Sequence, residues 1–553
     1  MLLWFPLPVL PCLIFEDEHL LVVNKPAGLN THAPGPYAGE GLYDGLRHRE
    51  PRWDGLAIIH RLDKETSGVI VFAKSPLANR SLTAQFTRRE VRKKYLLLTD
   101  RAILAKEFTA KSRLVRAGEK YLSRPLSAGG ETAETRFRPL RGTVAGAGPG
   151  DVESSQAGPC IMVEAEPLTG RTHQIRVHAA AQGFPVLGDT LYGGTSAGRV
   201  YLHAAEIAFM HPVSGKSLRF AAPVTFAADP RQSLRAALLE PEVTDAFRVL
   251  HGASDGWPGW YVDRLGPSLL SQGEAPLSER QRRELERLGR RYAARNAYHK
   301  QLIRRLGGTS VDESSPRPVL GTAGPKQFTV RENGLRFELS FAEGYSVGLF
   351  LDQRENRRRL LTGHVAAGFP LFPATAGPRR PEVLNTFAYT CGFSVCAANA
   401  GCHTTSVDLS RKYLDWGKRN FTLNELALAG HEFLSGDVFD WLKRLAKKQR
   451  LFDVILLDPP TFSRSKASGV FRAEKDYGRL VAAALPLLRR GGTLFASTNA
   501  ADWPAEDFLT AVQAPLHAAR RNVVNLHYAP QPPDFPVSRA EPAYLKTVWL
   551  RAE

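Results

Sequence analysis

A single aspartate in a basic, hydroxyl-rich segment is the first candidate for covalent chemistry. Residues His60–Gly68 read HRLDKETSG and lie between the apolar runs Leu56–Ile59 and Val69–Ala73, an arrangement that suits a turn leading into a strand. Basic residues stand on both sides of Asp63, and a nearby cation favours the ionised form of a carboxyl, which is a nucleophile. A lone aspartate beside an arginine is more often a structural ion pair, so this segment alone leaves both interpretations open.

Further aspartates stand at the ends of expected strands in the C-terminal half. Strands and helices alternate from Glu382 onward, which indicates a parallel sheet with helices on both faces. Ligands bind at the carboxyl ends of such strands, and an acid about 20 residues after the first strand usually binds ribose hydroxyls. Asp408 stands at about that distance after Asn385, while Asp437 and Asp458 close the next two strand-like runs.

The loop after the first of these strands reads NTFAYTCGF at residues 385–393. It would bring Phe387, Tyr389 and Gly392 close to a nucleotide-type ligand. With only one glycine, the loop is a weak motif when taken by itself.

The sequence DPPTF, which begins at Asp458, is more specific. Pro459 and Pro460 stiffen a turn whose carbonyls and carboxylate would hold a nitrogen of a base, and Phe462 would stack on that base. A Pro-Pro turn that merely ends a strand is the alternative interpretation of the tripeptide.

The composition indicates a globular chain of several domains that binds a polyanion. The chain has 553 residues, more than one ordinary core, which suggests two to four domains. It is 43% hydrophobic and 23% charged, and its net charge of +18 would favour contact with phosphates. Charge alone is weak evidence, because a basic protein need not bind nucleic acid.

Neither a membrane span nor a metal site is expected. Met1–Ile14 is apolar but contains prolines and no basic segment, so it is a poor signal peptide, and no run approaches the ~20 apolar residues of a bilayer span. The five cysteines lack paired C-x-x-C spacing, and His173 and His178 have no third ligand nearby. We therefore expect a cytoplasmic protein with reduced thiols and no metal.

Patterns along the chain divide it into units. The first domain, residues 1–226, reads as short strands of a mixed, largely antiparallel sheet, with a solvated loop at Gly142–Pro159. A linker at 227–242 leads to a β-rich module at 243–320, which contains Asp-Gly and Pro-Gly turns and the basic helix Gln281–Arg295. The third unit, 325–553, contains an insertion at Gly363–Pro381. The fold class is therefore multidomain α/β. The segments expected to be regular are the strands Leu20–Asn24, Val69–Lys74, Lys94–Leu98, Thr135–Arg138, Cys160–Glu166, Leu218–Phe220, Glu382–Asn385, Thr404–Val407, Phe452–Leu457 and Thr493–Ser497, and the helices Leu77–Phe86, Ser394–Asn399, Arg411–Asn420 and Arg479–Arg489.

The segment around Asp63 resembles the catalytic signature of the RluA family of pseudouridine synthases. Three further segments fit the family in order: Val22–Gly28 resembles its first strand and turn, Val91–Tyr95 its tyrosine motif, and Leu168–His178 its arginine motif. The resemblance extends to about Phe226. It implies a mixed antiparallel-sheet domain that isomerises uridine to pseudouridine without a cofactor.

This resemblance assigns roles to four residues. Asp63 would attack the ribose or the uracil ring of a flipped uridine, and Arg61 would fill the gap that the base leaves in the stack. Tyr95 would stack on the base and help to move the proton. Arg176 would pair with Asp63 and hold it oriented and ionised. Extraction of a base from its stack costs a few kcal/mol.

The rest of the chain resembles the RlmI/RlmK group of ribosomal RNA methyltransferases. Phe247–Arg264 is similar to the small middle domain of that group, Gly344–Arg354 to the first motif of its catalytic domain, and the DPPTF loop to the catalytic loop of class I methyltransferases. The resemblance implies a Rossmann-like domain that uses S-adenosylmethionine. The cofactor-binding residues it implies are Phe350, Asp352, Arg354, Asn385, Phe387, Tyr389, Gly392, Asp408, Asp437 and Asp458.

The sequence thus predicts two RNA-modifying enzymes in one chain, with ribosomal RNA as the expected substrate and transfer RNA as an alternative. Methylation of cytosine C5 needs a cysteine thiolate, and neither the stretch Asp458–Ser463 nor Phe495–Ala500 contains one. We therefore expect a guanine nitrogen, N7 ahead of N2, to receive the methyl group. The alternatives are a C5-cytosine methyltransferase, an assembly factor with one active domain, and a methyltransferase for proteins or small molecules, which the charge disfavours.

Overall fold

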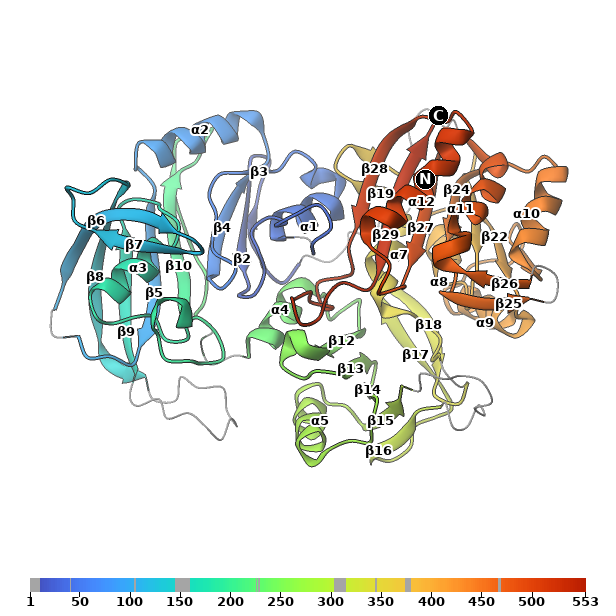
Figure 1. The fold of residues 1–553 in the computed structure, drawn as a ribbon, viewed down its shortest axis with the longest axis horizontal. Coiled ribbons are helices and arrows are strands. Elements are labelled where there is room, and N and C mark those ends of the chain that lie inside the picture. The colour runs from blue at the N-terminus through green and yellow to red at the C-terminus, as the bar shows by residue number, and fades with distance from the viewer. Residues whose placement is uncertain are drawn as a thin grey trace.

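The computed structural model describes residues 10–39, 41–103, 106–144, 160–224, 226, 229–302, 315–343, 346–372, 379–465 and 469–553. Figure 1 shows three lobes: a β-rich lobe at the left, a small module at the bottom, and an α/β lobe at the right. They follow one another in the sequence, so the multidomain α/β class expected from the sequence is confirmed.

The N-terminal lobe is built on one 11-stranded sheet. Its strand order is β1-β2-β4-β10-β5-β9-β8-β6-β7, with β11 beside β10 and β3 beside β4, and most neighbours are antiparallel. The pair β4 and β10 is parallel. The elements of this lobe are β1 (Leu13–Glu16), β2 (Leu20–Lys25), α1 (Leu42–Arg49), β3 (Ala57–Ile58), β4 (Ser67–Ala73), α2 (Pro76–Thr87), β5 (Arg92–Thr99), β6 (Phe108–Ala117), β7 (Lys120–Arg124), β8 (Glu131–Val144), β9 (Cys160–Pro167), α3 (Gln174–Ala181), β10 (Leu202–Met210) and β11 (Ser217–Ala221).

Local sequence explains the centre of this sheet. Every residue of β4 is buried, as expected for a continuous apolar run between strands that are covered on both faces. Helix α2 begins where Ser75 accepts a hydrogen bond from the amide of Ala78, with Pro76 in the first turn. The expected strands and the expected helix in this lobe are confirmed. The expected loop is wrong at its start, because β8 continues to Val144; residues 145–159 lie outside the described part of the chain.

The segment expected to be a linker contains a helix, α4 (Pro230–Leu238), which Asp229 caps. The middle module follows as a sheet of order β12-β13-β14-β15-β16, in which β14 and β15 are parallel and α5 connects them. A hairpin, β17 and β18, then leads to the C-terminal lobe. The bounds are β12 (Ala246–His251), β13 (Trp260–Leu265), β14 (Ser268–Gly273), α5 (Glu279–Arg291), β15 (Asn296–Gln301), β16 (Arg317–Gly321), β17 (Gln327–Glu332) and β18 (Leu335–Ser340).

The C-terminal lobe is a doubly wound sheet of order β23-β22-β21-β24-β27-β29-β28. Its first five strands run parallel, and β29 is antiparallel to both of its neighbours. The order reverses between β21 and β24, which is where such sheets bind ligands. The elements are α7 (Arg354–Thr362), β19 (His364–Ala366), β20 (Phe369–Pro370), β21 (Glu382–Thr386), α8 (Gly392–Asn399), β22 (His403–Asp408), α9 (Arg411–Leu423), β23 (Glu432–Ser435), α10 (Val438–Lys447), β24 (Phe452–Leu457), β25 (Phe462–Ser465), β26 (Gly469–Arg472), α11 (Ala473–Ala484), β27 (Leu488–Thr498), α12 (Ala505–Ala518), β28 (Val523–Ala529) and β29 (Lys546–Ala552).

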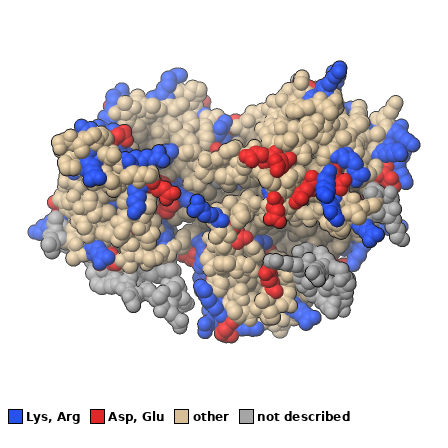
Figure 2. Space-filling view, in the orientation of Figure 1, with Lys and Arg blue, Asp and Glu red and all other residues tan. Residues whose placement is uncertain are grey.

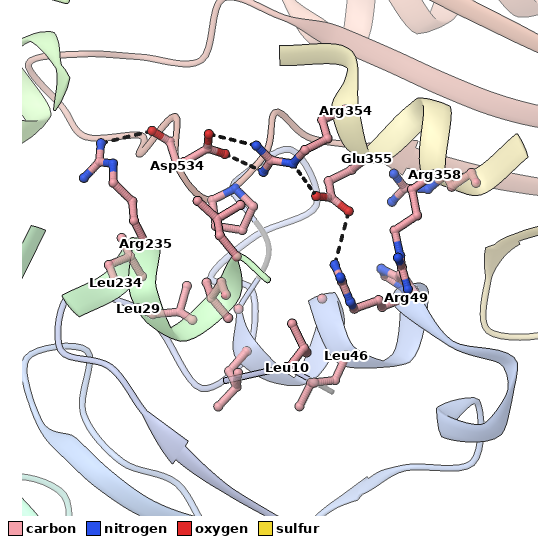
Figure 3. A pocket seen from close by; sticks show the side chains of 18 of the residues that line it. Leu10, Leu29, Leu46, Arg49, Leu234, Arg235, Arg354, Glu355, Arg358 and Asp534 are labelled. Carbon is pink, nitrogen blue, oxygen red and sulfur yellow. Dashed lines mark hydrogen bonds and ion pairs between the residues drawn. The ribbon is translucent and has the colours of Figure 1, made fainter. Parts of the chain in front are cut away.

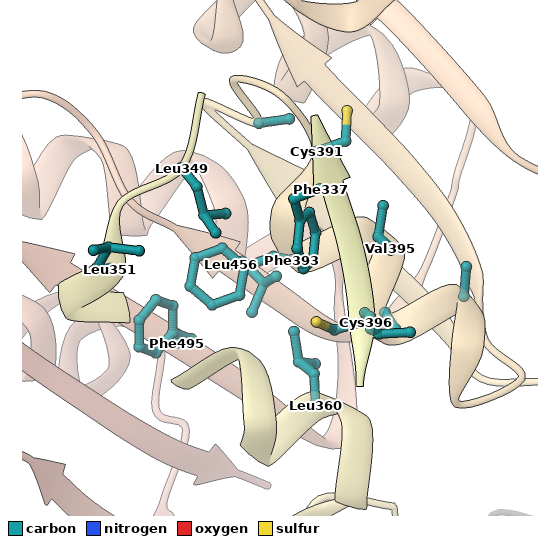
Figure 4. Packing of buried hydrophobic residues seen from close by; sticks show 14 of the residues in the cluster. Phe337, Leu349, Leu351, Leu360, Cys391, Phe393, Val395, Cys396, Leu456 and Phe495 are labelled. Atoms are coloured by element: carbon teal, nitrogen blue, oxygen red, sulfur yellow. The ribbon is translucent and has the colours of Figure 1, made fainter. Parts of the chain in front are cut away.

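Two cores cover the two faces of this sheet. Along β24, Val454 and Leu456 belong to one cluster of buried residues, whereas Ile455 and Leu457 belong to the other. Successive side chains of a strand point to opposite faces, so the alternation assigns one cluster to each face. Figure 4 shows the first cluster, where Phe393 packs near Leu456 and Phe495.

Most of the strands and helices expected in this lobe are confirmed, and three boundaries differ. The expected helix Arg479–Arg489 is too long, because α11 ends at Ala484 and β27 begins at Leu488. Asp437 does not close a strand; it caps α10. The expected insertion begins with the β19–β20 hairpin, and its residues 373–378 lie outside the described part.

The N-terminal and C-terminal lobes meet through charged side chains on α1 and α7. Arg358 donates to Glu50 at 2.6 Å, and Arg49 contacts both Glu240 and Glu355, at 2.5 and 3.5 Å. Figure 3 shows Arg49, Glu355 and Arg358 at a cavity of about 70 Å³, whose lining also includes leucines such as Leu46. Buried arginines with carboxylate partners therefore connect the two lobes.

Candidate active sites

Asp63 lines a large cleft in the N-terminal lobe. It belongs to the loop between β3 and β4, and the cleft has a volume of about 1130 Å³. Its side chain is 26% exposed, so the carboxylate is open to a ligand. Arg61 and Tyr95 also line the cleft. The structure thus brings the four residues that the resemblance assigned into one cleft, since Arg176 lines it as well.

The cation beside Asp63 is Arg176. Its Nη1 atom lies 3.4 Å from Oδ2 of Asp63 and 3.7 Å from a carboxylate oxygen of Glu65. Arg61, which flanks Asp63 in the sequence, is exposed and forms no ion pair within the described residues. The arginine that is close to Asp63 in the sequence, Arg61, is therefore not the arginine that contacts it in the fold, Arg176.

Arg176 is held in place by Asp189, a residue that the sequence analysis did not identify. The two side chains form a bidentate pair, with Nε–Oδ2 at 2.6 Å and Nη2–Oδ1 at 2.8 Å, and Asp189 is 1% exposed. Burial lowers the pKa of Arg176, but the hydrogen bonds and charge of Asp189 outweigh it, so the pKa lies above its usual range. The guanidinium is therefore fixed as a cation with one edge toward Asp63.

Backbone packing explains the glycine of the motif. Gly68 has φ of +118° and lies opposite Ala204 of β10, where an added Cβ would be 2.2 Å from the Ala204 carbonyl oxygen. Only glycine permits this approach. On the other side of the loop, Thr31 exchanges two hydrogen bonds with the backbone of Leu62, at 2.8 and 3.1 Å. These contacts fix the backbone on both sides of Asp63.

Tyr95 lies on β5, opposite Ala204 and Ala165 of the neighbouring strands. Burial, with a smaller contribution from the charge of Asp63, raises the pKa of its hydroxyl. The phenol is therefore neutral at physiological pH and keeps its proton, which it can donate or relay.

The two histidines of the arginine motif have other partners. His173 has φ of +56° at the start of α3, and its ring bonds to the Tyr192 hydroxyl at 2.8 Å. The ring of His178 bonds to Ser112 and Thr135. Among the described residues no group of three or more His, Cys, Asp or Glu is placed to hold a metal ion.

The second site lies at the carboxyl ends of the parallel strands. The loop after β21 contains three non-glycine residues with positive φ: Phe387 at 55°, Tyr389 at 47° and Cys391 at 61°. A positive φ is uncommon in residues other than glycine, and the residues that have one cluster at functional sites. The loop therefore achieves with a strained backbone the conformation that glycines provide in other nucleotide-binding loops.

Asp408 ends β22 and faces this loop. Its two carboxylate oxygens accept the amides of Tyr389 and Ser410, both at 2.8 Å. Burial raises the pKa of Asp408 despite these hydrogen bonds. Each carboxylate oxygen has further acceptor capacity, so the residue can bind hydroxyl groups while it holds the loop.

Asp458 follows β24 at the same edge. Burial raises its pKa to about 6, against hydrogen bonds from Ser497 and Gln353. The amide of Gln353 lies 3.3 Å from both oxygens of Asp458 and donates to the Ser497 hydroxyl at 2.8 Å. Gln353 was not predicted to be a site residue, although it stands between Asp352 and Arg354, which were selected from the same motif.

Aromatic side chains surround this edge of the sheet. Phe350 is 47% exposed, and its ring centroid lies 5.4 Å from that of Tyr389. Tyr389 in turn contacts Tyr413 with a T-shaped geometry. Phe462 is exposed just after the two prolines. An adenine or a substrate base would find stacking surfaces here.

Four residues selected from the sequence have hydrogen-bond or ion-pair partners within the protein. The guanidinium of Arg354 is buried against Asp534 and Glu355, at the contact between lobes. Asn385 donates to Ser394 at 2.9 Å. Asp437 caps α10. Asp352 accepts a hydrogen bond from the Tyr544 hydroxyl at 2.8 Å.

Gly392 is placed for packing. A Cβ at this position would lie 3.3 Å from both Arg357 Cδ and Leu349 Cδ1. Because Gly392 begins α8, its small size lets the strained loop pass close to α7 and to the segment before it. The residue therefore lets α8 begin close to α7 at the carboxyl ends of the strands.

Comparison with known proteins finds a different family in each half of the chain. Residues 19–181 match the model of the RNA pseudouridylate synthase family, and residues 250–551 match that of the S-adenosylmethionine-dependent methyltransferase family. A ribosomal RNA large subunit methyltransferase from Deinococcus radiodurans is 35% identical over 335 residues, which are 59% of this chain and 78% of that protein.

The N-terminal half has relatives of its own. Ribosomal large subunit pseudouridine synthase C from Yersinia pestis is 36% identical over 226 residues; these are 38% of this chain and span 65% of the relative's length. Among solved structures, a putative SAM-dependent methyltransferase from Streptococcus mutans aligns with a TM-score of 0.49 and 25% identity, over 62% of this chain and 87% of that one. The chain belongs to the S-adenosylmethionine-dependent methyltransferase family and carries an RNA pseudouridylate synthase domain in its N-terminal half.

Proposed function

We propose that this bifunctional enzyme acts on ribosomal RNA, where it converts a uridine to pseudouridine and methylates a guanine nitrogen. The observation that carries the proposal is the pair of separate catalytic carboxylates, Asp63 in the cleft of one lobe and Asp458 at the sheet edge of the other. The Deinococcus relative is named a ribosomal RNA large subunit methyltransferase, and the Yersinia relative a ribosomal large subunit pseudouridine synthase. The net charge of +18 suits a polyanionic substrate.

In the synthase domain, Asp63 acts as the nucleophile on a uridine that has been flipped into the cleft. Asp63 forms a bond to C1′ of the ribose or to the uracil ring, and the bond between N1 and C1′ breaks. After the ring turns, C5 bonds to C1′, the bond to Asp63 breaks, the C5 proton leaves and N1 takes up a proton. Arg176 orients Asp63 through the contact between their side chains, and Tyr95 lies in the same cleft as a neutral phenol that can relay the proton. Arg61 is exposed at the cleft and is placed to enter the gap in the RNA stack.

In the methyltransferase domain, S-adenosylmethionine supplies the methyl group. The residues present fit this cofactor: Asp408 offers carboxylate oxygens at the end of β22, and Phe350 offers an exposed ring beside the strained loop. Asp458 and the backbone of the two prolines would hold the target base. Methylation at N7 removes no proton from the base, whereas methylation at N2 does, and Asp458, whose pKa burial raises to about 6, would accept that proton at neutral pH.

The preference for a guanine nitrogen rests on the thiols. The cysteines nearest the cofactor loop, Cys391, Cys396 and Cys402, are all buried. Burial raises the pKa of Cys391 and of Cys402 to about 12 each, and that of Cys396 further still. A thiol in that state does not attack C6 of cytosine, whereas a guanine nitrogen already has a lone pair and needs only positioning.

The test compares ribosomal RNA from cells with and without this gene. Nucleosides from digested RNA are separated and quantified by mass spectrometry, and the same RNA is treated with the purified enzyme and labelled cofactor. We expect one missing pseudouridine and one missing methylguanosine, N7 ahead of N2, both restored in vitro. Label in 5-methylcytidine that survives Cys391→Ser would refute the guanine assignment. Unchanged ribosomal RNA together with modified transfer RNA would refute the substrate.

The residues that the structure describes include no helix long and apolar enough to cross a membrane. We propose a cytoplasmic location, where ribosomal RNA is accessible. Fractionation of cells that produce the tagged chain tests this. Recovery in the membrane pellet after a high-salt wash would contradict it.

A further inference from the structure

A two-stranded ribbon projects from the methyltransferase lobe directly after the catalytic loop. Strands β25 and β26 pair only with each other, and Figure 1 places them at the lower right edge of that lobe. Thr461 separates β25 from the two prolines, and its carbonyl accepts the amide of Ala473 at 3.0 Å, which closes the base of the ribbon. The ribbon is therefore fixed to the loop that contains Asp458.

The two faces of the ribbon differ in character. Phe471 is 4% exposed and packs beside Phe387 and Phe439, with ring centroids 6.2 Å away in both cases. The same face thus contacts the cofactor loop through Phe387. Side chains alternate along a strand, so the neighbours of Phe471 on β26 point to the other side.

That outward face carries two apolar and two cationic side chains. The register pairs Phe462 with Arg472 and Arg464 with Val470, so all four share one face. Phe462 is 58% exposed and Val470 is 45% exposed, and both arginines are also exposed. Within the described residues neither guanidinium has an ion-pair partner.

Exposed apolar side chains beside guanidinium groups without ion-pair partners suit contact with a nucleic acid strand better than exposure to water. Exposed aromatic rings stack on bases whatever the sequence, and unpaired guanidinium groups bind phosphates. Lys and Arg side chains occur on all three lobes in the view of Figure 2, so overall charge does not say where RNA binds. The ribbon combines both kinds of contact next to the catalytic loop.

We propose that the outward face of the β25–β26 ribbon, formed by Phe462, Arg464, Val470 and Arg472, grips the RNA strand beside the methylated base. The inference deepens the proposed function and rests on RNA being the substrate of the C-terminal lobe. Phe462, expected from the sequence to stack on the target base, lies on the outward face and stacks instead on a neighbouring base, while the two arginines bind phosphates of the same strand. Because Phe471 packs against Phe387, the ribbon holds RNA on its outer face at a fixed place relative to the cofactor loop.

The test uses the full chain and, as probe and substrate, deproteinised large-subunit ribosomal RNA from cells that lack this gene. Arg464→Ala, Arg472→Ala and the double variant are compared with Arg490→Ala. Arg490 is an exposed arginine near the start of β27, at the edge of the sheet opposite the site, so its removal changes the charge equally. Methyl transfer, RNA binding at several salt concentrations, and cofactor binding by calorimetry are measured for each.

We expect the KM for RNA in methyl transfer to rise about tenfold in the double variant, with the cofactor affinity unchanged. The slope of log K against log salt should fall by ~0.7 for each arginine removed, as for a single strand. Phe462→Leu should weaken RNA binding without a change in that slope, because a ring and not a charge is lost. Arg490→Ala should behave as the wild type.

Three outcomes would overturn the proposal, and a fourth would refute only the proposed substrate. If the double variant and Arg490→Ala have the same RNA affinity and the same KM for RNA, the ribbon does not bind RNA. A protein partner would then be the occupant of its outward face. A parallel loss of cofactor affinity would mean that the arginines support the fold of the cofactor edge. If the wild-type chain binds this RNA with the arginine-dependent salt slope but does not methylate it, the RNA-binding role of the ribbon stands and the proposed substrate is refuted. If the wild-type chain neither binds nor methylates this RNA, the ribbon proposal and the proposed substrate are refuted together.

Discussion

Asp189 binds Arg176 through two short hydrogen bonds, at 2.6 and 2.8 Å, while Arg176 reaches Asp63 with its remaining nitrogen at 3.4 Å. The short pair lies in the protein interior and the long contact at the wall of the cleft. Asp189 therefore acts through Arg176 and positions the cation that faces the nucleophile.

Asp189→Asn is expected to lower kcat for pseudouridine formation by about 10- to 100-fold, because Arg176 loses its fixed orientation. The KM for RNA should change little, since Asp189 is buried. Asp189→Glu should recover part of the activity because the charge is restored. Methyl transfer by the same preparations serves as the control. Equal kcat in the wild type and Asp189→Asn would show that Arg176 is positioned by other contacts.

Asp63→Asn is expected to abolish pseudouridine formation, because the amide keeps the shape of the carboxylate but is not a nucleophile. RNA binding and methyl transfer should remain at wild-type levels. Tritium release from RNA labelled at C5 of uridine measures the reaction. Near wild-type release by the purified variant would contradict the assignment of Asp63.

How far the sequence predicted the synthase site depends on the kind of residue. Asp63, Tyr95 and Arg176 stand in segments with a recognisable pattern, and the fold places them in one cleft. Asp189 comes from a turn after α3 with no chemical pattern around it. Its one local signal is Gly188, with φ of +81°, where a Cβ would clash with the Arg199 carbonyl. Such tertiary pairing cannot be seen in a single sequence.

The methyltransferase site shows a similar limit. Strand-helix alternation predicted the parallel sheet and the positions of Asp408 and Asp458. Arg354 was selected because it stands in a motif, yet its guanidinium lies among buried carboxylates at the lobe contact. Neighbours along a helix point in different directions, so a motif does not say which of its side chains face the ligand. Gln353, one residue earlier, is the one that contacts Asp458.

Asp408→Ala is expected to weaken binding of S-adenosylmethionine about 10- to 100-fold, because hydrogen bonds to a charged acceptor contribute about 1.5–3 kcal/mol. Calorimetry on the full chain measures the affinity. Asp415→Ala is the matched control, since it removes an acidic side chain from the exposed part of α9. Binding that is equal in both variants would place the cofactor elsewhere.

The pH dependence of stability should reveal the buried carboxyl of Asp458. Burial raises its pKa from the usual 3.8 to about 6, so the folded state binds the proton more tightly than the unfolded state. Its contribution to stability is therefore most favourable below about pH 4 and is lost as pH rises through 6. Asp458→Asn removes this dependence.

Thermal unfolding of the two proteins between pH 5 and pH 8 checks this expectation. Relative to the wild type, Asp458→Asn should gain stability as pH rises, while its methyl transfer is lost. A difference in Tm that stays constant across this range would show that Asp458 is already ionised in the folded protein at pH 5.

The contact between Glu50 and Arg358 should make the two enzyme lobes unfold together. Arg358 is buried, its pKa is lowered to about 10 by burial and by Arg49, and Glu50 is the carboxylate that bonds to it at 2.6 Å. Removal of one partner leaves a buried charge without compensation, which costs about 3–5 kcal/mol. Glu50→Ala should therefore separate one calorimetric transition into two, with each lobe close to its own stability and both activities retained at 25 °C.

Arg358→Met, which removes the charge and keeps an apolar chain of similar length, should cost less than Glu50→Ala. A single transition in Glu50→Ala at the wild-type temperature would mean that the remaining contacts, Arg49 with Glu240 and Glu355, are sufficient to couple the lobes.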